Sequence, residues 1–320
     1  MDTPRIGLVL GAGGTVGGAF HAGVLGALAE ATGWDPRTAA VIVGTSAGSI
    51  TGTGLRAGLS AADAYANSTG RPVSREGGRL LAAVGRGGGG FDRVGSRRLR
   101  PAGAMAATLA GAVARPLAAR PTAVLAGLVP DGVVGTGMIS GGVEALTHGR
   151  WPDQPLWICA VRQRDGRRIV FGRDQRPPLP AAVAASCAIP AFFAPVDVEG
   201  EAFVDGGAHS PTNADVLGDE RLDLVVVVSP MSIAGRGLRL APDQPARRWA
   251  RSRLDAEARR LRRAGVPVIA FQPTATDAGV MAGNALDPAK RRPVAEQAHA
   301  STLARLARPD VADRLSILRR

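Results

Sequence analysis

The chain has 320 residues, 45% of them hydrophobic and only 4% aromatic, so it can bury a sizeable core of small apolar side chains and is not a disordered protein. The apolar content is mostly Ala, Val and Leu, which favours packed α/β layers over a β-sandwich. The net charge of +12 comes almost entirely from arginine without interleaved aromatic residues for base stacking, so we expect no nucleic-acid partner, whereas peripheral contact with an anionic membrane surface is compatible with it.

The sequence shows no cluster of metal ligands, and we expect neither a metal nor an organic cofactor. Cys159 and Cys187 lie in the apolar segments LWICAV and AASCAIP, which predicts that both are buried small hydrophobic side chains. The N-terminus lacks the pattern of a signal peptide, and its apolar run is too short to span a bilayer. We therefore expect a cytoplasmic protein with peripheral membrane contact at most.

The first sixty or so residues alternate between strand and helix patterns. A short apolar run at residues 5–10 ends in glycines and predicts a buried parallel strand. Residues 17–31 carry apolar side chains at helical spacing, residues 40–43 predict a second strand, and residues 49–59 are compatible with a helix. This β-α-β-α order predicts a three-layer α/β/α sandwich with a mainly parallel central sheet.

The pattern becomes irregular between about residues 67 and 137. This segment contains a Gly-rich run at 85–98 and an Ala-rich stretch at 101–130 that is interrupted by Pro116 and Pro121. Arginines divide its apolar stretches, so a transmembrane helix does not fit. We expect an insertion or cap over the core, with amphipathic segments that attach to a membrane surface.

The remainder of the chain returns to strand and helix patterns. Strands are predicted at residues 156–161 and 168–171, before the segment FVDGG, and at LDLVVVVSP and VPVIAFQP. One helix is predicted to end near Ile189, a charged helix is predicted at 247–264, and the polar tail at about 288–320 is predicted to be helical. No repeat of twenty to fifty residues is present, and a length of 320 residues allows one large domain or two small ones.

The strongest chemical signal is the pentapeptide GTSAG, which has the form G-x-S-x-G and lies between a predicted strand and a predicted helix. Gly44 and Gly48 allow a sharp turn with closely approaching backbones, so that the hydroxyl of Ser46 projects from the turn. The dipole of the following helix favours negative charge near Ser46. The setting predicts a nucleophilic serine.

A Gly-rich loop at residues 11–18 follows the first strand. A dinucleotide-binding loop is the alternative interpretation, but such a site expects an acidic residue at the end of the second strand, and this strand ends in GTSAG. Beside a nucleophilic serine, the loop is better explained as an oxyanion hole. The backbone N–H groups of Gly13 and Gly14 are the predicted donors.

The third signal is the sequence Asp205, Gly206, Gly207, which follows an apolar run. Alone it is typical of an ordinary turn. An Asp at a strand end can, however, lie close to the C-terminal turn of another strand, because such ends converge at the ligand crevice of doubly wound sheets. Together with the other two signals, it predicts that Asp205 belongs to the same site as Ser46.

These segments together resemble the patatin-like phospholipases, in which a Gly-rich loop, G-x-S-x-G and D-G-[GA] occur in this order. The matching segments are VLGAGGTVGGAFHAGVL, GTSAGS, AASCAIPAFFAPV and FVDGGAHSPTNAD. The resemblance implies a single patatin-like domain over residues 1–320 and a lipid-acyl hydrolase. It also implies that Ser46 is the nucleophile, that Asp205 is the base and that Gly13 and Gly14 are the oxyanion donors. Because a carboxylate is a weak base, such a pair needs partial desolvation and direct contact, and it suits esters more than amides.

The sequence departs from the family pattern at Val16, where the family usually has Arg or Lys. The change removes a contact to a lipid phosphate or to the loop. We therefore expect phosphate-free acyl esters to be used comparatively well.

Two alternative functions stay open at this point. A Ser-His-Asp triad is one, because His209 lies four residues beyond Asp205, whereas His21, His148 and His299 lie in contexts typical of structural roles. The other is a non-catalytic protein on the same scaffold that binds a lipid or a partner.

Overall fold

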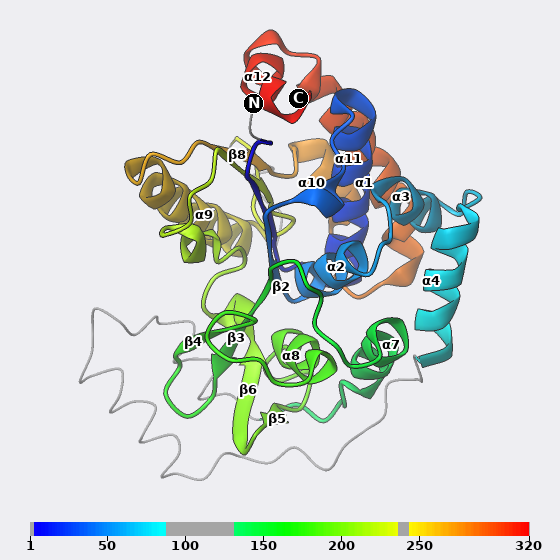
Figure 1. Ribbon diagram of the computed structural model, residues 1–320, viewed down its shortest axis with the longest axis vertical. Helices are drawn as coiled ribbons and strands as arrows, with labels where there is room; N and C mark the ends of the chain where they lie inside the picture. Colours follow the sequence, from blue (N-terminus) through cyan, green and yellow to red (C-terminus); the bar gives the residue numbers. More distant parts are fainter. Residues whose placement is uncertain (1–2, 88–130, 236–242, 320) are drawn as a thin grey trace.

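The computed structural model describes residues 3–87, 131–235 and 243–319, and a single sheet of eight strands forms the centre of this part of the chain (Figure 1). The strand order is β5-β6-β3-β2-β1-β7-β8, and β4 pairs with β3 outside this path. The strands are β1 (Ile6–Leu10), β2 (Val41–Thr45), β3 (Leu156–Arg162), β4 (Arg168–Phe171), β5 (Val196–Val198), β6 (Glu201–Asp205), β7 (Leu224–Val228) and β8 (Val268–Phe271).

Most of the sheet is parallel, as predicted. Strand β1 pairs in parallel with β2 and β7, β2 pairs in parallel with β3, and β7 with β8. These strands are short runs of aliphatic residues that are buried on both faces, which is typical of parallel sheets covered by helices. The antiparallel part lies at one edge, where β4 and β6 pair with β3 and β5 pairs with β6.

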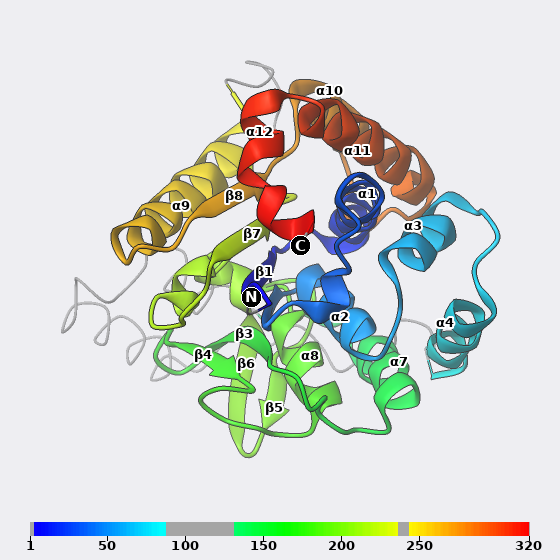
Figure 2. The same cartoon turned by 45° about the horizontal axis from the view of Figure 1, so that its top comes forward.

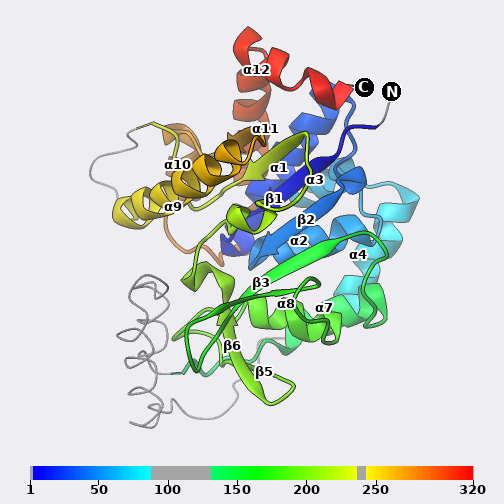
Figure 3. The same cartoon turned by 60° about the vertical axis from the view of Figure 1, so that its left-hand side comes forward.

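Helices cover both faces of the sheet and produce the predicted three layers (Figures 2 and 3). The helix α9 (Gln244–Arg263) covers one face, together with the short turn η3 (Ala214–Leu217). The other helices are α1 (Gly14–Thr32), α2 (Ala47–Arg56), α3 (Ala61–Thr69), α4 (Arg75–Gly87), α7 (Gly137–Thr147), α8 (Leu179–Ser186), α10 (Ala275–Met281), α11 (Arg291–Leu306) and α12 (Pro309–Arg314). Short 3₁₀ turns are η1 (Pro36–Thr38), η2 (Gly206–Ala208), η4 (Pro288–Lys290) and η5 (Ser316–Arg319).

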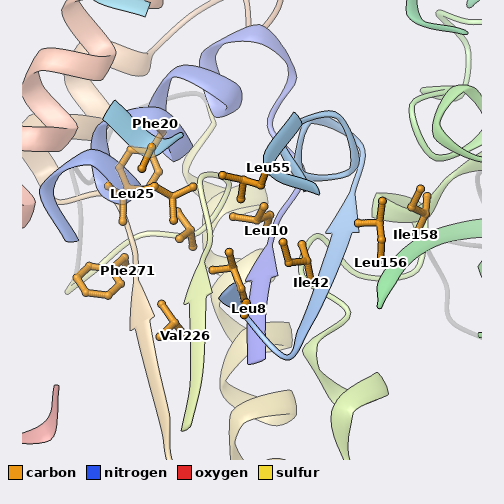
Figure 4. Close-up of a cluster of buried hydrophobic side chains, with 14 of the residues drawn as sticks. Leu8, Leu10, Phe20, Leu25, Ile42, Leu55, Leu156, Ile158, Val226 and Phe271 are labelled. Carbon is orange, nitrogen blue, oxygen red and sulfur yellow. The ribbon is translucent and has the colours of Figure 1, made fainter. Parts of the chain in front are cut away.

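The two faces of the sheet contribute to different hydrophobic clusters, because successive side chains of a strand point to opposite faces. Leu8 and Leu10 of β1 pack with Phe20 of α1 and with the helices on that side (Figure 4). Val9, between them, packs instead with Leu254 of α9. The strands nearest the site are therefore fixed from both sides.

The segment between residues 67 and 137 is more regular than expected where the structure describes it. Helix α3 extends to Thr69, and α4 occupies residues that were expected to be irregular. Although glycines weaken helices, α4 is strongly amphipathic, and it packs on α7 (Figure 1). The Ala-rich stretch at 101–130, with its predicted membrane attachment, lies outside the described residues. No helix in the described part of the chain is both long and apolar enough to cross a membrane.

Candidate active site

Ser46 lies on a strained turn between β2 and α2. Its backbone has φ +54° and ψ −122°, a combination that a residue with a side chain rarely adopts, and its side chain is only 4% exposed. A Cβ atom on Gly48 would lie 1.8 Å from the carbonyl oxygen of Leu10, and one on Gly44 would lie 2.5 Å from Cα of Ser49. Both glycines are therefore required by close backbone packing, which places Ser46 as the G-x-S-x-G pattern predicts.

A second serine supports this turn. The backbone N–H of Ser46 donates to Oγ of Ser186 at 2.9 Å, and the hydroxyl of Ser186 donates to the carbonyl oxygen of Cys159 at 2.7 Å. This relay connects the turn to the end of α8 and to β3. Ser186 lies within AASCAIP, but no role was predicted for it; a lone hydroxyl in an Ala-rich helix is the signal that was available.

Asp205 reaches Ser46 by its register across β3, from a strand that is antiparallel to β3. Strand β6 is antiparallel to β3, with Asp205 opposite Ala160, whereas Thr45 is opposite Cys159 on the other side of β3. The residue after Thr45 thus lies level with Asp205. The chain also passes very close to β3 here, since a Cβ on Gly206 would lie 2.2 Å from the carbonyl oxygen of Cys159.

The surroundings of Asp205 raise its affinity for a proton. The side chain is 5% exposed, and burial raises its pKa to about 6, against the opposing effects of a hydrogen bond with the Ser46 side chain and of the Gly207 N–H. That N–H donates to Oδ1 of Asp205 at 2.7 Å. The carboxylate is thus desolvated and lies against Ser46.

The Gly-rich loop places Gly13 and Gly14 at the N-terminal end of α1. Neighbouring N–H groups have backbone acceptors: that of Gly11 donates to Val228, that of Ala12 to Pro211 and that of Val16 to Ala285. Gly13 is the N-cap residue and Gly14 the first helical residue, where N–H groups have no acceptor within a helix. Both glycines line the same cavity as Ser46 and Asp205, at the positive end of the helix dipole.

Two cavities meet at Ser46. The first, here called the Asp205 cavity, has a volume of about 320 Å³ and contains Asp205, Gly13 and Gly14. The second, here called the Ile50 cavity, has a volume of about 370 Å³. Its lining is largely aliphatic and comes mainly from α1, α2, α3, α4 and α7, with Ile50, Leu80, Leu81, Val84, Met138 and Ile139 among its residues.

Asn213 links the two predicted halves of the site. Its Nδ2 donates to Oγ1 of Thr45 at 3.1 Å and to the carbonyl oxygen of Ser210 at 2.6 Å, so it connects the β2 turn with the loop after Asp205. The backbone of Asn213 is left-handed, at φ +53°, which Asn tolerates better than most residues. Glu257 of α9 holds the same loop, because its Oε2 accepts from Oγ1 of Thr212 at 2.6 Å. Neither residue was predicted to have a role.

The histidines occupy other positions. His21 is fully buried in α1, where burial lowers its pKa to about 3, and its Nδ1 lies 3.1 Å from Oγ1 of Thr51. His148 caps the end of α7, and His299 pairs with Glu30 on the surface. His209 is half-buried and is not among the described residues that line either cavity. The predicted burial of Cys159 and Cys187 is confirmed.

Val16 lines the Asp205 cavity, but its replacement of a basic residue does not leave that cavity without a cation. Arg247 of α9 lines the same cavity, beside Asp243. Its Nε donates to Oδ2 of Asp243 at 2.6 Å, and its Nη1 donates to the carbonyl oxygens of Pro230 and Ser232. Arg247 is far from the Gly-rich loop in sequence and lies in a helix rich in arginine, so it was not predicted to belong to the site.

Comparison with known proteins identifies the class. A family model described as patatin-like phospholipase matches residues 8–217, which is more than half of the chain. The match defines a lipid acyl hydrolase, and the chain belongs to the patatin-like phospholipase family. No curated protein matches it. Among solved structures, the crystal structure of VipD from Legionella pneumophila is similar over 95% of this chain and 67% of that chain, with 14% identity and a TM-score of 0.41.

Because Asp205 is buried, we expect its replacement by a neutral side chain to raise the free energy of unfolding. Because its folded pKa is raised, the neutral form stabilises the fold at low pH, and this contribution is lost as pH rises through about 6. Asp205→Asn is expected to raise the free energy of unfolding by about 1–3 kcal/mol at pH 8 and by much less at pH 4. Denaturant unfolding at both pH values measures this. Asp197→Asn, at an exposed position of β5, is the control, and a gain that is larger at pH 4 contradicts the assignment.

The link made by Asn213 predicts a loss of turnover. Asn213→Ala removes the contact with Thr45, so kcat on a short ester is expected to fall about tenfold or more while KM changes little, alongside a stability loss of about 1–3 kcal/mol. Steady-state kinetics and thermal unfolding separate these effects. Thr53→Val removes a buried hydroxyl of α2 that takes no part in the contact between Asn213 and Thr45, and it is the control for stability alone. Equal kcat losses in both variants would leave no positioning role for Asn213.

Proposed function

We propose that the protein cleaves carboxylic ester bonds of phospholipids or related acyl esters, with Ser46 as nucleophile and Asp205 as base. The observation that carries this proposal is the shared site: a serine on a strained strand-to-helix turn contacts a buried carboxylate whose pKa is raised to about 6. A carboxylate with that pKa is ionised at neutral pH and is a better proton acceptor than an ordinary Asp.

The first half of the reaction forms an acyl-enzyme. Oγ of Ser46 attacks the ester carbonyl while its proton passes to Asp205, and the N–H groups of Gly13 and Gly14 stabilise the oxyanion. Collapse of the tetrahedral intermediate breaks the bond to the alcohol, which leaves with the proton from Asp205. In the second half, water loses its proton to Asp205, attacks the acyl group and releases the fatty acid, and Ser46 recovers its proton.

These proton transfers determine which part of the substrate occupies each cavity. The departing alcohol must lie against Asp205, because that residue protonates it, so the alcohol side of the substrate occupies the Asp205 cavity. The acyl chain then extends into the Ile50 cavity, whose aliphatic lining suits it. A bulky side chain such as Phe at Ala22, in that lining, should shorten the preferred acyl chain.

Two substitutions test the pair of residues. Ser46→Ala and Asp205→Asn are each expected to lower kcat/KM on short p-nitrophenyl esters at least a thousandfold, or about 4 kcal/mol, with folding preserved. His209→Ala is the matched control and is expected to remain active. The reverse result, with Asp205→Asn active and His209→Ala inactive, would establish the triad. A fluorophosphonate probe should label Ser46; a folded protein that the probe leaves unlabelled would instead be a binding protein.

The pH profile is a second test. Because Asp205 must be ionised to accept a proton, kcat/KM is expected to fall as pH drops below about 6 and to be flat from about pH 7 to 8. Initial rates across pH 4.5–8.5, on an ester without ionisable groups, measure it. A midpoint that is unchanged in His209→Ala supports Asp205 as the titrating group, whereas a midpoint that is abolished by this substitution contradicts it.

A further inference from the structure

The wall of the Asp205 cavity carries an ion pair that the proposed reaction does not use. Asp243 and Arg247 lie four residues apart at the start of α9, and both line this cavity. The side chain of Arg247 is 10% exposed and that of Asp243 is 38% exposed, so the carboxylate is the more accessible member. Among the described residues that line the cavity, Arg247 is the only basic one.

The ion pair lines the cavity that the proposed reaction assigns to the alcohol side of the substrate. Ser46, Asp205, Gly13 and Gly14 form one part of the lining, and apolar side chains such as Met231, Met281 and Leu286 form another. Since the departing alcohol occupies this cavity, groups attached to that alcohol are brought to the same wall. In a phospholipid, those groups are the glycerol backbone and then the headgroup.

Arg247 is held in place before any ligand binds. One nitrogen pairs with Asp243, and another donates to the carbonyl oxygens of Pro230 and Ser232 at 3.1 and 3.2 Å. A guanidinium fixed in this way loses little further side-chain entropy when it binds an anion, and its Nη2, which none of these bonds uses, can donate to a phosphate oxygen. Asp243 offers a negative charge directly beside it.

We propose that Arg247 and Asp243 form a headgroup subsite for zwitterionic phospholipids, in which Arg247 binds the phosphate and Asp243 binds the ammonium group. This inference rests on the proposed function. Fixed positive and negative charges side by side complement a ligand that carries both, whereas a purely anionic headgroup meets repulsion from Asp243. The pair thus supplies the phosphate contact that Val16 cannot make.

A structural role is the rival explanation, because Arg247 also braces the loop at Pro230, which packs against Gly13. Loss of that bracing would disturb the oxyanion loop and slow every substrate alike. Headgroup binding instead changes the ratio between substrates. The decisive measurement is therefore a ratio of kcat/KM values for substrates with identical acyl chains: lysophosphatidylcholine, lysophosphatidylglycerol and monoacylglycerol, all below their micelle concentrations.

Arg247→Met is expected to lower the ratio of lysophosphatidylcholine to monoacylglycerol about tenfold or more. Arg247→Lys, which keeps the charge, is expected to retain part of that ratio and serves if the Met variant does not fold. Asp243→Asn is expected to lower the ratio of lysophosphatidylcholine to lysophosphatidylglycerol about threefold to tenfold. The matched control is Arg251→Met, which disrupts another i, i+4 pair of α9, with Asp255, outside the Asp205 cavity.

Ratios that stay constant in the Arg247 and Asp243 variants, or that change equally in Arg251→Met, overturn the subsite. Wild-type protein that cleaves p-nitrophenyl esters but none of the three lipids also overturns it, while leaving the proposed hydrolase standing. Wild-type protein that cleaves none of these substrates and resists the fluorophosphonate probe overturns both. The subsite therefore fails separately from the reaction on which it rests.

Discussion

The contact between Ser46 and Asp205 is the constraint on which the surrounding structure depends. Ser46 directly follows β2 and Asp205 ends β6, and β3 lies between these two strands, so the side chains must meet across β3. The side chain of β3 at that level on the same face is small, Ala160, and Gly206 lets the chain approach β3 closely. A larger residue at either position would push the Ser46 hydroxyl and the Asp205 carboxylate apart.

The antiparallel hairpin of β5 and β6 brings Asp205 level with Ser46. Strand β2 ends at Thr45, opposite Cys159, whereas β3 continues to Arg162. Strand β6 runs back along β3 from that end until Asp205 lies opposite Ala160, in a covered position. Burial there raises the pKa of Asp205 to about 6, which an exposed loop in contact with water would not do.

Local features of the sequence predicted most of this site, and long-range features did not. The apolar runs before GAGG and GTSAG indicate strands, and the glycines of both segments indicate tight turns into helices. The positions of Ser46, Gly13 and Gly14 could therefore be inferred. The direction of β6 could not, because AFVDGG is compatible with either pairing. Ser186, Asn213 and Arg247 act through partners far away in sequence, and α4 owes its helix to packing against α7 despite its glycines.

Val16 shows how a substitution in one loop can be misjudged without its tertiary neighbours. Seen in the sequence, a valine in place of a basic residue removes positive charge from the oxyanion loop. In the fold, Val16 is buried at 2% exposure, and its N–H is bonded to Ala285, so a long basic side chain there would have to displace the residues around it. Arg247 enters the same cavity from a different element, on which its charge is balanced by Asp243. In the proposed reaction, stabilisation of the oxyanion depends on Gly13 and Gly14 at the start of α1, whereas recognition of the proposed headgroup depends on Arg247 and Asp243 at the start of α9. The proposal therefore places the two tasks on separate elements of the fold, where each could be adjusted without the other.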